Sequence, residues 1–81
     1  MNSVILYGKP GCHLCDEAYE LVLSLQGDCE LNIIKSDVTL DAALMSEYGE
    51  RIPVLVVNNK MVLTAPIRPE EVRRALKVVG A

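Results

Sequence analysis

The sequence of 81 residues contains no tryptophan and no phenylalanine, and its only aromatic side chains are three tyrosines. Its interior must therefore be packed mainly from aliphatic side chains, which dominate the 51% of residues that are hydrophobic. This supply suits a small α/β domain, and a chain of this length has no room for a second core. We expect a single domain over residues 1–81.

The sequence also lacks long apolar runs and clusters of basic residues. Runs such as Val54–Val57 are far shorter than the roughly 20 residues of a membrane-spanning helix, and the N-terminus lacks the pattern of a signal peptide. The net charge is −3, whereas nucleic-acid binding needs a concentrated Lys/Arg surface. We expect a cytoplasmic monomer that binds neither membranes nor nucleic acid.

Cysteine is scarce, but two of the three cysteines have a motif spacing. Cys12 and Cys15 form a C-x-x-C pair, whereas Cys29 lies alone before a predicted strand and is interpreted as a small hydrophobic residue. Half of a zinc site is the alternative for the pair. A structural zinc needs four ligands, and the sequence has neither a second C-x-x-C nor a histidine pair. We therefore predict redox use of Cys12 and Cys15 and no metal site.

Hydrophobic periodicity alternates between the two and the 3.6 residues typical of strands and helices. It predicts the order β-α-β-α-β-β-α. The two asparagines of Asn58-Asn59-Lys60 favour the positive φ of a tight antiparallel hairpin. The predicted strands contain Val4–Tyr7, Leu31–Ile34, Val54–Val57 and Met61–Thr64, and the predicted helices cover about Cys12–Leu25, Leu40–Tyr48 and Pro69–Val79.

The predicted helices have apolar faces and recognisable ends. In the first helix, Leu14 is expected to widen the buried stripe and Gly27 to end the helix. In the second helix, Leu40, Leu44 and Tyr48 are expected to share the buried face, with Thr39 or Asp41 as the cap. In the third helix, Gly80 is the expected stop. The residues expected to be buried in the first and third helices are Cys15, Ala18, Val22 and Leu25, and Val72, Ala75, Leu76 and Val79.

The C-x-x-C pair follows the first predicted strand and opens the first predicted helix. The helix N-terminus favours a thiolate at Cys12, and the thiolate is the nucleophile in disulfide exchange. Cys15, one turn later, is within reach of Cys12 and points more toward the interior. We therefore predict a reversible Cys12–Cys15 disulfide in which Cys12 attacks and Cys15 resolves the mixed disulfide.

The element order and two motifs resemble the thioredoxin fold in its smallest form, with glutaredoxins as the closest likeness. The segment Tyr7-Gly8-Lys9-Pro10-Gly11-Cys12-His13-Leu14-Cys15 is similar to the glutaredoxin segment that leads into C-P-Y-C. The segment Ile52-Pro53-Val54 is similar to the cis-proline signature of the family. Cys12-His13-Leu14-Cys15-Asp16-Glu17 resembles a group of short glutaredoxin-like proteins. The resemblance covers the whole chain and implies a four-stranded mixed sheet with three helices.

The resemblance also implies roles for residues beside the dithiol. Pro53 is expected to follow a cis bond, which exposes the backbone of Ile52 to an extended substrate. Lys9 corresponds to a lysine that attracts a thiolate or a substrate carboxylate, with a solvated loop charge as the alternative. His13 is either a base that assists Cys12 or an exposed side chain.

The sequence departs from the glutaredoxin pattern at Thr64-Ala65-Pro66, where glutaredoxins carry a Gly-Gly pair that approaches glutathione. A proline lacks the backbone donor, and the close backbone approach is lost without glycine. We therefore expect no cofactor and poor recognition of glutathione.

The resulting prediction is a thiol–disulfide oxidoreductase that reduces protein disulfides or exchanges with low-molecular-weight thiols. Two alternatives remain open. In one, two chains share an iron–sulfur cluster through Cys12 and external thiols, as some glutaredoxins do. In the other, the chain is a non-catalytic binding module that keeps the fold.

Overall fold

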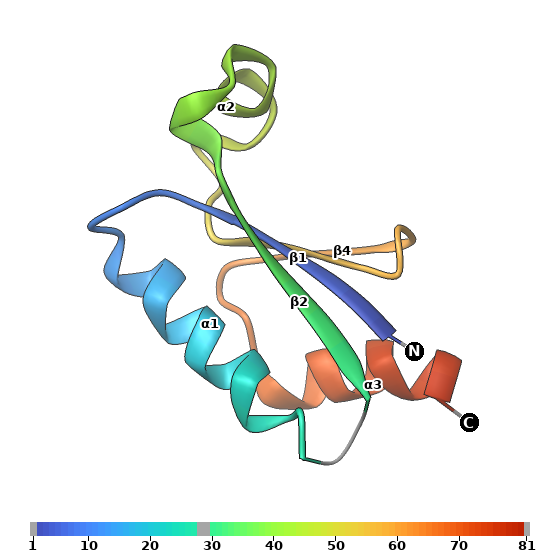
Figure 1. The fold of residues 1–81 in the computed structure, drawn as a ribbon. Helices are drawn as coiled ribbons and strands as arrows, with labels where there is room; N and C mark the ends of the chain where they lie inside the picture. The colour runs from blue at the N-terminus through green and yellow to red at the C-terminus, as the bar shows by residue number, and fades with distance from the viewer. Residues whose placement is uncertain (1, 28–29, 81) are drawn as a thin grey trace.

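The computed structural model describes residues 2–27 and 30–80, so the expectation for Cys29 lies outside the described residues. The strands form one four-stranded sheet, and Figure 1 shows the long helices on one side of it and the short helix beyond its end. The elements are β1 (Asn2–Gly8), α1 (His13–Ser24), β2 (Leu31–Asp37), the 3-10 turn η1 (Val38–Leu40), α2 (Ala42–Tyr48), β3 (Val54–Val57), β4 (Met61–Thr64) and α3 (Pro69–Gly80). This order confirms the predicted β-α-β-α-β-β-α architecture.

The sheet is mixed and has the order β2-β1-β3-β4. β2 runs parallel to β1 because α1 provides a crossover between them, whereas β3 pairs with β1 and β4 in the antiparallel sense. Asn58 and Asn59 both have positive φ, at 52° and 59°, as the hairpin prediction requires. Within the described residues, no helix combines the length and apolar character that crossing a bilayer requires.

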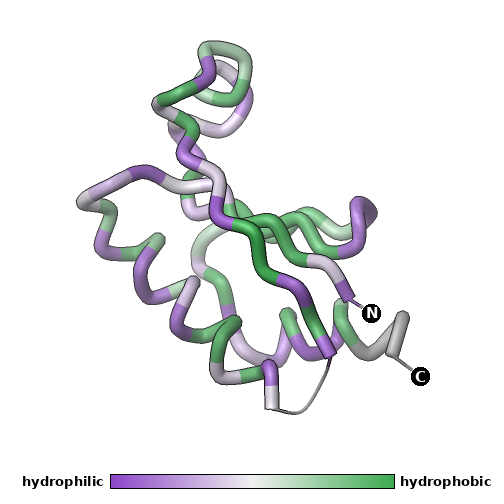
Figure 2. Tube along the Cα trace, viewed as in Figure 1, coloured by the Kyte–Doolittle hydropathy of each residue, from purple (hydrophilic) through white to green (hydrophobic). Residues whose placement is uncertain are grey.

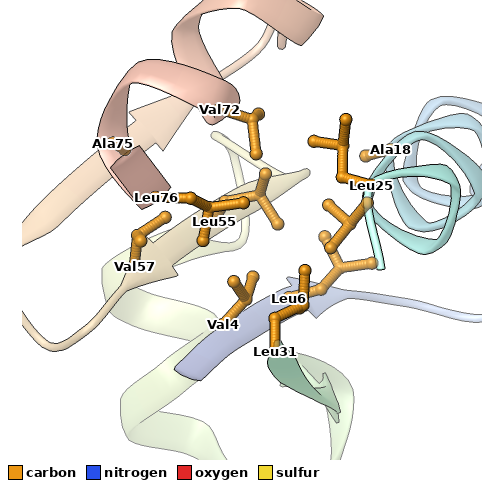
Figure 3. Packing of buried hydrophobic residues seen from close by; sticks show 11 residues of the cluster. Val4, Leu6, Ala18, Leu25, Leu31, Leu55, Val57, Val72, Ala75 and Leu76 are labelled. Carbon is orange, nitrogen blue, oxygen red and sulfur yellow. The ribbon is translucent and has the colours of Figure 1, made fainter. Parts of the chain in front are cut away.

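The hydrophobic core lies between the sheet and the two long helices. β1 alternates buried and half-buried residues, which places Val4 and Leu6 under the helices. Figure 3 shows these side chains meeting residues of α1, α3 and β3. Figure 2 shows a mostly apolar sheet and an α1 that alternates apolar and polar residues, as expected of a helix with one buried face. The core contains Val4, Leu6, Ala18, Val22, Leu25, Leu31, Leu55, Val57, Val72, Ala75 and Leu76.

The predictions for the two long helices were confirmed for the buried faces and wrong for the end of α1. Four residues of the predicted first helix are buried as expected, namely Cys15, Ala18, Val22 and Leu25, and so are Val72, Ala75 and Leu76 of α3. The expectation for Val79 concerns a side chain outside the described part of the structure. α1 ends at Ser24, three residues before Gly27, with Leu25 in the αR conformation as its C-cap. α3 extends to Gly80, the residue expected to end it.

The second helix differs most from the prediction. Leu40 is not part of α2 and its side chain is 83% exposed, and α2 has no fully buried residue. Asp37 caps η1 and Asp41 caps α2, so two side chains divide the expected helix into two short pieces. A helix of seven residues at the end of the sheet has little surface to bury, although Tyr48 stacks on Tyr7 of β1 with ring centroids 4.5 Å apart.

Candidate functional site: a dithiol at the start of the first long helix

The loop between β1 and α1 places Cys12 at the N-cap of α1. Gly11 has a φ of +79°, which a residue with a side chain adopts only at a cost, and the Cys12 amide donates to the Lys9 carbonyl at 3.3 Å. The Cys12 side chain accepts a hydrogen bond from the Cys15 amide at 3.2 Å. The Cys12 sulfur therefore occupies the position at which a helix N-terminus stabilises negative charge.

Cys15 lies in the first turn of α1 and faces the sheet. Its side chain is only 5% exposed, whereas Cys12 is half-buried. The two cysteines form a disulfide, with their Cα atoms 5.2 Å apart, as the motif spacing predicts. Gly8 lies against Cys15 so closely that a Cβ at residue 8 would be 2.9 Å from the Cys15 Sγ. Glycine at the end of β1 therefore makes room for the buried cysteine.

A groove of about 490 Å³ runs beside the dithiol between α1 and the segments that flank β3 and β4. Pro53 and Leu14 both line it, so the structure brings the proline next to the first turn of α1. The Ile52–Pro53 bond is cis, which confirms the prediction for this bond. Glu17 is the single charged residue of the lining, which consists of Leu14, Glu17, Ala18, Leu21, Pro53, Ala65, Pro66 and Ile67.

The expectation that Leu14 is buried was wrong, since its side chain is 57% exposed and borders this groove. Periodicity places Leu14 beside the apolar stripe of α1, but in the structure its side chain lines an open groove and is not covered by the core. The groove wall at Ala65 and Pro66, which are joined by a second cis bond, was also not predicted. An X-Pro pair in the sequence does not specify which isomer the chain adopts.

His13 and Lys9 lie apart from the groove. The His13 Nε2 pairs with a Glu17 carboxylate oxygen at 3.1 Å on the surface, where the histidine side chain is 87% exposed. Lys9 is exposed and lines a different hollow, which it shares with Cys15. Of the residues predicted from the sequence to bind substrate, Pro53 therefore lines the groove and Lys9 lines the other hollow. His13 and Ile52 line neither. Among the residues that the structure describes, no group of three His, Cys, Asp or Glu residues is arranged to hold a metal ion.

Solved structures with this fold include two proteins at moderate identity. The X-ray structure of protein XcR50 from X. campestris is 32% identical, has a TM-score of 0.79, and the match covers 93% of this chain and 96% of that chain. The solution NMR structure of protein Ne2328 from Nitrosomonas europaea is 25% identical, has a TM-score of 0.80, and the match covers 93% and 91% of the two chains.

A mutant thioredoxin from Halobacterium salinarum NRC-1 is 19% identical, with a TM-score of 0.78 and coverage of 99% of this chain and 75% of that chain. This likeness concerns the fold alone, and it establishes a thioredoxin-like fold. No curated protein matches the chain. The profile of the glutaredoxin-like domain (DUF836) matches residues 3–77, which include both cysteines and Pro53. The chain therefore belongs to the glutaredoxin-like domain (DUF836) family.

Proposed function

We propose that this protein is a thiol–disulfide oxidoreductase that cycles Cys12 and Cys15 between a dithiol and a disulfide. The observation that carries the proposal is the asymmetry of the pair. Cys12 is half-buried at the helix N-cap and accepts the Cys15 amide hydrogen bond, while Cys15 is buried behind it. The Cys12 sulfur is therefore the more accessible of the two to a large substrate, and the Cys15 sulfur is largely shielded behind it.

The proposed reaction has two exchange steps. The Cys12 thiolate attacks one sulfur of a substrate disulfide and releases the other as a thiolate, which forms a mixed disulfide. The Cys15 thiolate then attacks the Cys12 sulfur, releases the second substrate thiolate and forms the Cys12–Cys15 disulfide. Two electrons pass from the protein to the substrate, and the two released thiolates take up protons from solvent.

The helix N-terminus assists the first exchange step and also the later reduction of the disulfide. In the first step, it raises the fraction of Cys12 present as thiolate, because the Cys15 N–H and the helix dipole favour the charged form. When external thiols later reduce the disulfide, the first attacks Cys12 and releases the Cys15 thiolate. The second attacks the outer sulfur of the resulting mixed disulfide, and there the same stabilisation makes Cys12 a good leaving group.

The groove beside the dithiol supports polypeptides as the substrate class. Its lining is largely apolar, and it begins at Leu14 and passes Pro53. An extended chain that carries a disulfide can lie along this groove with its backbone near Ile52, as the resemblance to glutaredoxins suggests. We therefore propose protein disulfides as the main substrates, with low-molecular-weight thiols as exchange partners.

Single-cysteine variants test the roles of the two sulfurs. In a Cys29→Ser background, which removes the third thiol, Cys12→Ser is expected to abolish attack on a protein disulfide. Cys15→Ser is expected to keep the attack and to accumulate a mixed disulfide, which intact-mass spectrometry detects. Equal loss of single-turnover attack in both variants contradicts the assignment, and a brown, cluster-absorbing protein after anaerobic purification favours the iron–sulfur alternative.

A further inference from the structure

A second hollow, with a volume of about 330 Å³, lies on the Cys15 side of the dithiol. We call it the lysine cleft and define it by Lys9, Lys35, Asp16, Ser36, Leu6 and Cys15, which lie around it. It shares no lining residue with the groove at Pro53. The two hollows are therefore separate, and Cys15 borders the lysine cleft but not the groove.

The lysine cleft lies where the carboxyl ends of two parallel strands meet the first turn of a helix. Leu6 of β1 is paired with Lys35 of β2, and the chain leaves both strands within a few residues of this pair. Ligands of open α/β sheets bind at the carboxyl ends of parallel strands, because the loops there diverge and leave a crevice. A volume of this size suits a ligand of about the size of an amino acid or a dipeptide, at the small end of ligand pockets.

Among the residues that the structure describes, the charged side chains of the cleft form no ion pairs with one another. Among the side chains that the structure describes, the ion pair present is His13–Glu17, so Lys9, Lys35 and Asp16 have no ion-pair partner there. Lys35 lines the cleft, and its Nζ lies 4.5 Å from the centre of the ring of Tyr19, a residue of α1 outside the lining.

Asp37, which also borders the cleft, is already engaged. Its Oδ1 accepts hydrogen bonds from the Thr39 amide at 2.9 Å and from the Thr39 hydroxyl at 2.6 Å. The cleft thus presents two ammonium groups and the Asp16 carboxylate to a ligand, beside the Asp37 carboxylate with its hydrogen-bonded Oδ1, above a floor that includes Leu6 and Cys15.

We propose that the lysine cleft binds the α-amino-acid group of a small sulfur-containing amino acid of the cysteine and cystine class. Lys9 and Lys35 take its carboxylate, Asp16 takes its ammonium group, and the short side chain lies on Leu6 beside Cys15. A zwitterion matches this set better than a simple anion, because a simple anion leaves Asp16 facing a like charge. The biological role of this binding site rests on the thiol–disulfide exchange activity proposed above.

In that activity, the bound class of ligand is the low-molecular-weight exchange partner. One thiol of this class forms a mixed disulfide with the protein and displaces one protein thiolate. A second thiol cleaves the mixed disulfide, which leaves the reduced dithiol and one small-molecule disulfide. Two electrons pass from two thiols to the protein.

Binding is measured with S-methyl-L-cysteine, a thioether that has the amino-acid group but cannot exchange. Titration calorimetry with the oxidised protein is expected to show saturable binding. Lys9→Gln and Asp16→Asn each remove one charge-assisted contact from an exposed residue and are expected to weaken binding about tenfold or more. Lys60→Gln, at the exposed β3–β4 turn, is the matched control and should leave the affinity unchanged.

Blocked ligands separate the two ends of the amino-acid group. The methyl ester of S-methyl-L-cysteine loses the contacts to lysine, and its N-acetyl form loses the contact to Asp16, so both are expected to bind at least tenfold more weakly. The proposal is overturned if the probe shows no saturable binding, if Lys60→Gln weakens binding as much as Lys9→Gln, or if both blocked forms bind as tightly as the probe.

The failure of this proposal is distinguishable from the failure of the proposed function. Dithiothreitol carries no amino-acid group, so its exchange with the Cys12–Cys15 disulfide does not need the lysine cleft. Exchange with dithiothreitol but no binding of the probe overturns the cleft alone. Binding of the probe by a protein whose disulfide does not exchange supports the cleft as a ligand site and overturns the oxidoreductase.

Discussion

At the scale of single residues, the reactive pair depends on a neighbour with no side chain. Gly8 ends β1 directly against the buried cysteine, and a Cβ there would lie 2.9 Å from the Sγ and 3.0 Å from the Cβ of Cys15. The nearest atoms belong to a cysteine that is held by its disulfide and by the first turn of α1. The clash therefore cannot be relieved by rotating a flexible side chain.

Gly8→Ala is expected to destabilise the oxidised protein by about 1–3 kcal/mol, the usual cost of overpacking a buried site. Urea denaturation of the oxidised protein measures the change in the free energy of unfolding. Gly27→Ala is the control, because a Cβ there meets no atom within 4 Å, and its effect should stay within about 0.5 kcal/mol. Equal stability of the two variants contradicts the role assigned to Gly8.

The N-cap position of Cys12 predicts a pH dependence in the reduced protein. The Cys15 amide and the helix N-terminus favour a thiolate at Cys12, so we expect the pKa of the Cys12 thiol in the reduced protein to lie below that of free cysteine. Because the folded-state pKa is the lower one, the resulting stabilisation is fully present above the unfolded-state pKa. It is lost as the pH falls through the folded-state pKa.

The rate of alkylation by iodoacetamide measures this thiolate. In a Cys15→Ser, Cys29→Ser variant, the midpoint of the pH profile should lie below that of the urea-unfolded protein. Asp16 and Glu17 lie in the first turns of the same helix and oppose the effect by their charge, so the shift should be moderate. A midpoint equal to that of the unfolded chain contradicts the prediction.

At the scale of elements, one asparagine adds side-chain hydrogen bonds between the β3–β4 hairpin and the start of β1, beyond the pairing of β3 with β1. The Lys60 amide donates to the Val57 carbonyl at 3.0 Å and closes the turn. The Asn58 Oδ1 accepts from the Ser3 amide at 2.8 Å, and its Nδ2 donates to the Asn2 Oδ1 at 3.1 Å. Asn58 therefore supplies both the turn conformation and a link between segments far apart in the sequence.

Two glycine substitutions separate these contributions. Asn58→Gly and Asn59→Gly both keep a residue that tolerates positive φ, but only the first removes hydrogen bonds between segments. We expect Asn58→Gly to lower the free energy of unfolding by about 1–3 kcal/mol and Asn59→Gly to change it by less than about 0.5 kcal/mol. Urea denaturation at one pH compares the two variants, and similar losses in both contradict the link.

The alternating periods in the sequence are sufficient to predict the strands, the two long helices and the hairpin, because each has a long or clearly bounded apolar pattern. They do not predict the division of the second helix. Leu40, Leu44 and Tyr48 have helical spacing, but Asp37 and Asp41 cap two separate turns and leave Leu40 exposed. Side-chain capping of the backbone competes with a continuous helix, and hydrophobic spacing does not report it.

The candidate site was predictable where a local motif determines it. The C-x-x-C spacing and the strand-to-helix transition place both cysteines, and the Ile52-Pro53 signature places the cis bond. The groove and the lysine cleft were not predictable from sequence. Each joins residues from segments far apart in the chain, such as Leu14 with Ile67, or Lys9 with Lys35, and no periodicity within one element encodes such a pairing.

At the scale of the whole molecule, the start of α1 borders two hollows of different chemistry, since Leu14 lines the groove and Cys15 lines the lysine cleft. The groove at Pro53 is largely apolar and carries the single acidic residue Glu17, whereas the lysine cleft carries both lysines that lie near the dithiol. A ligand with several carboxylates is therefore disfavoured in the groove. An apolar polypeptide segment meets no such obstacle there.

This arrangement predicts that the protein reduces protein disulfides faster than glutathione mixed disulfides. Glutathione bears two carboxylates, and the lining of the groove contains no basic side chain to pair with them. Pro66 also lacks the backbone N–H that could donate a hydrogen bond to a carboxylate. Each missing charge-assisted hydrogen bond costs about 1.5–3 kcal/mol, which is roughly tenfold to over a hundredfold in binding. Steady-state kinetics with insulin and with a glutathionylated peptide measure the ratio of kcat/KM values.

Glu17→Gln tests the physical reason, because it removes a negative charge from the groove without changing its shape. We expect this variant to raise kcat/KM for the glutathionylated peptide and to leave that for insulin nearly unchanged. Glu20→Gln, an exposed position of α1 outside the groove lining, is the control and should change neither value. If the wild-type protein instead processes the glutathionylated peptide with a low KM and a high kcat, another basic residue supplies the missing contacts. Arg68, at the start of α3 and next to the groove residue Ile67, is then the first residue to replace.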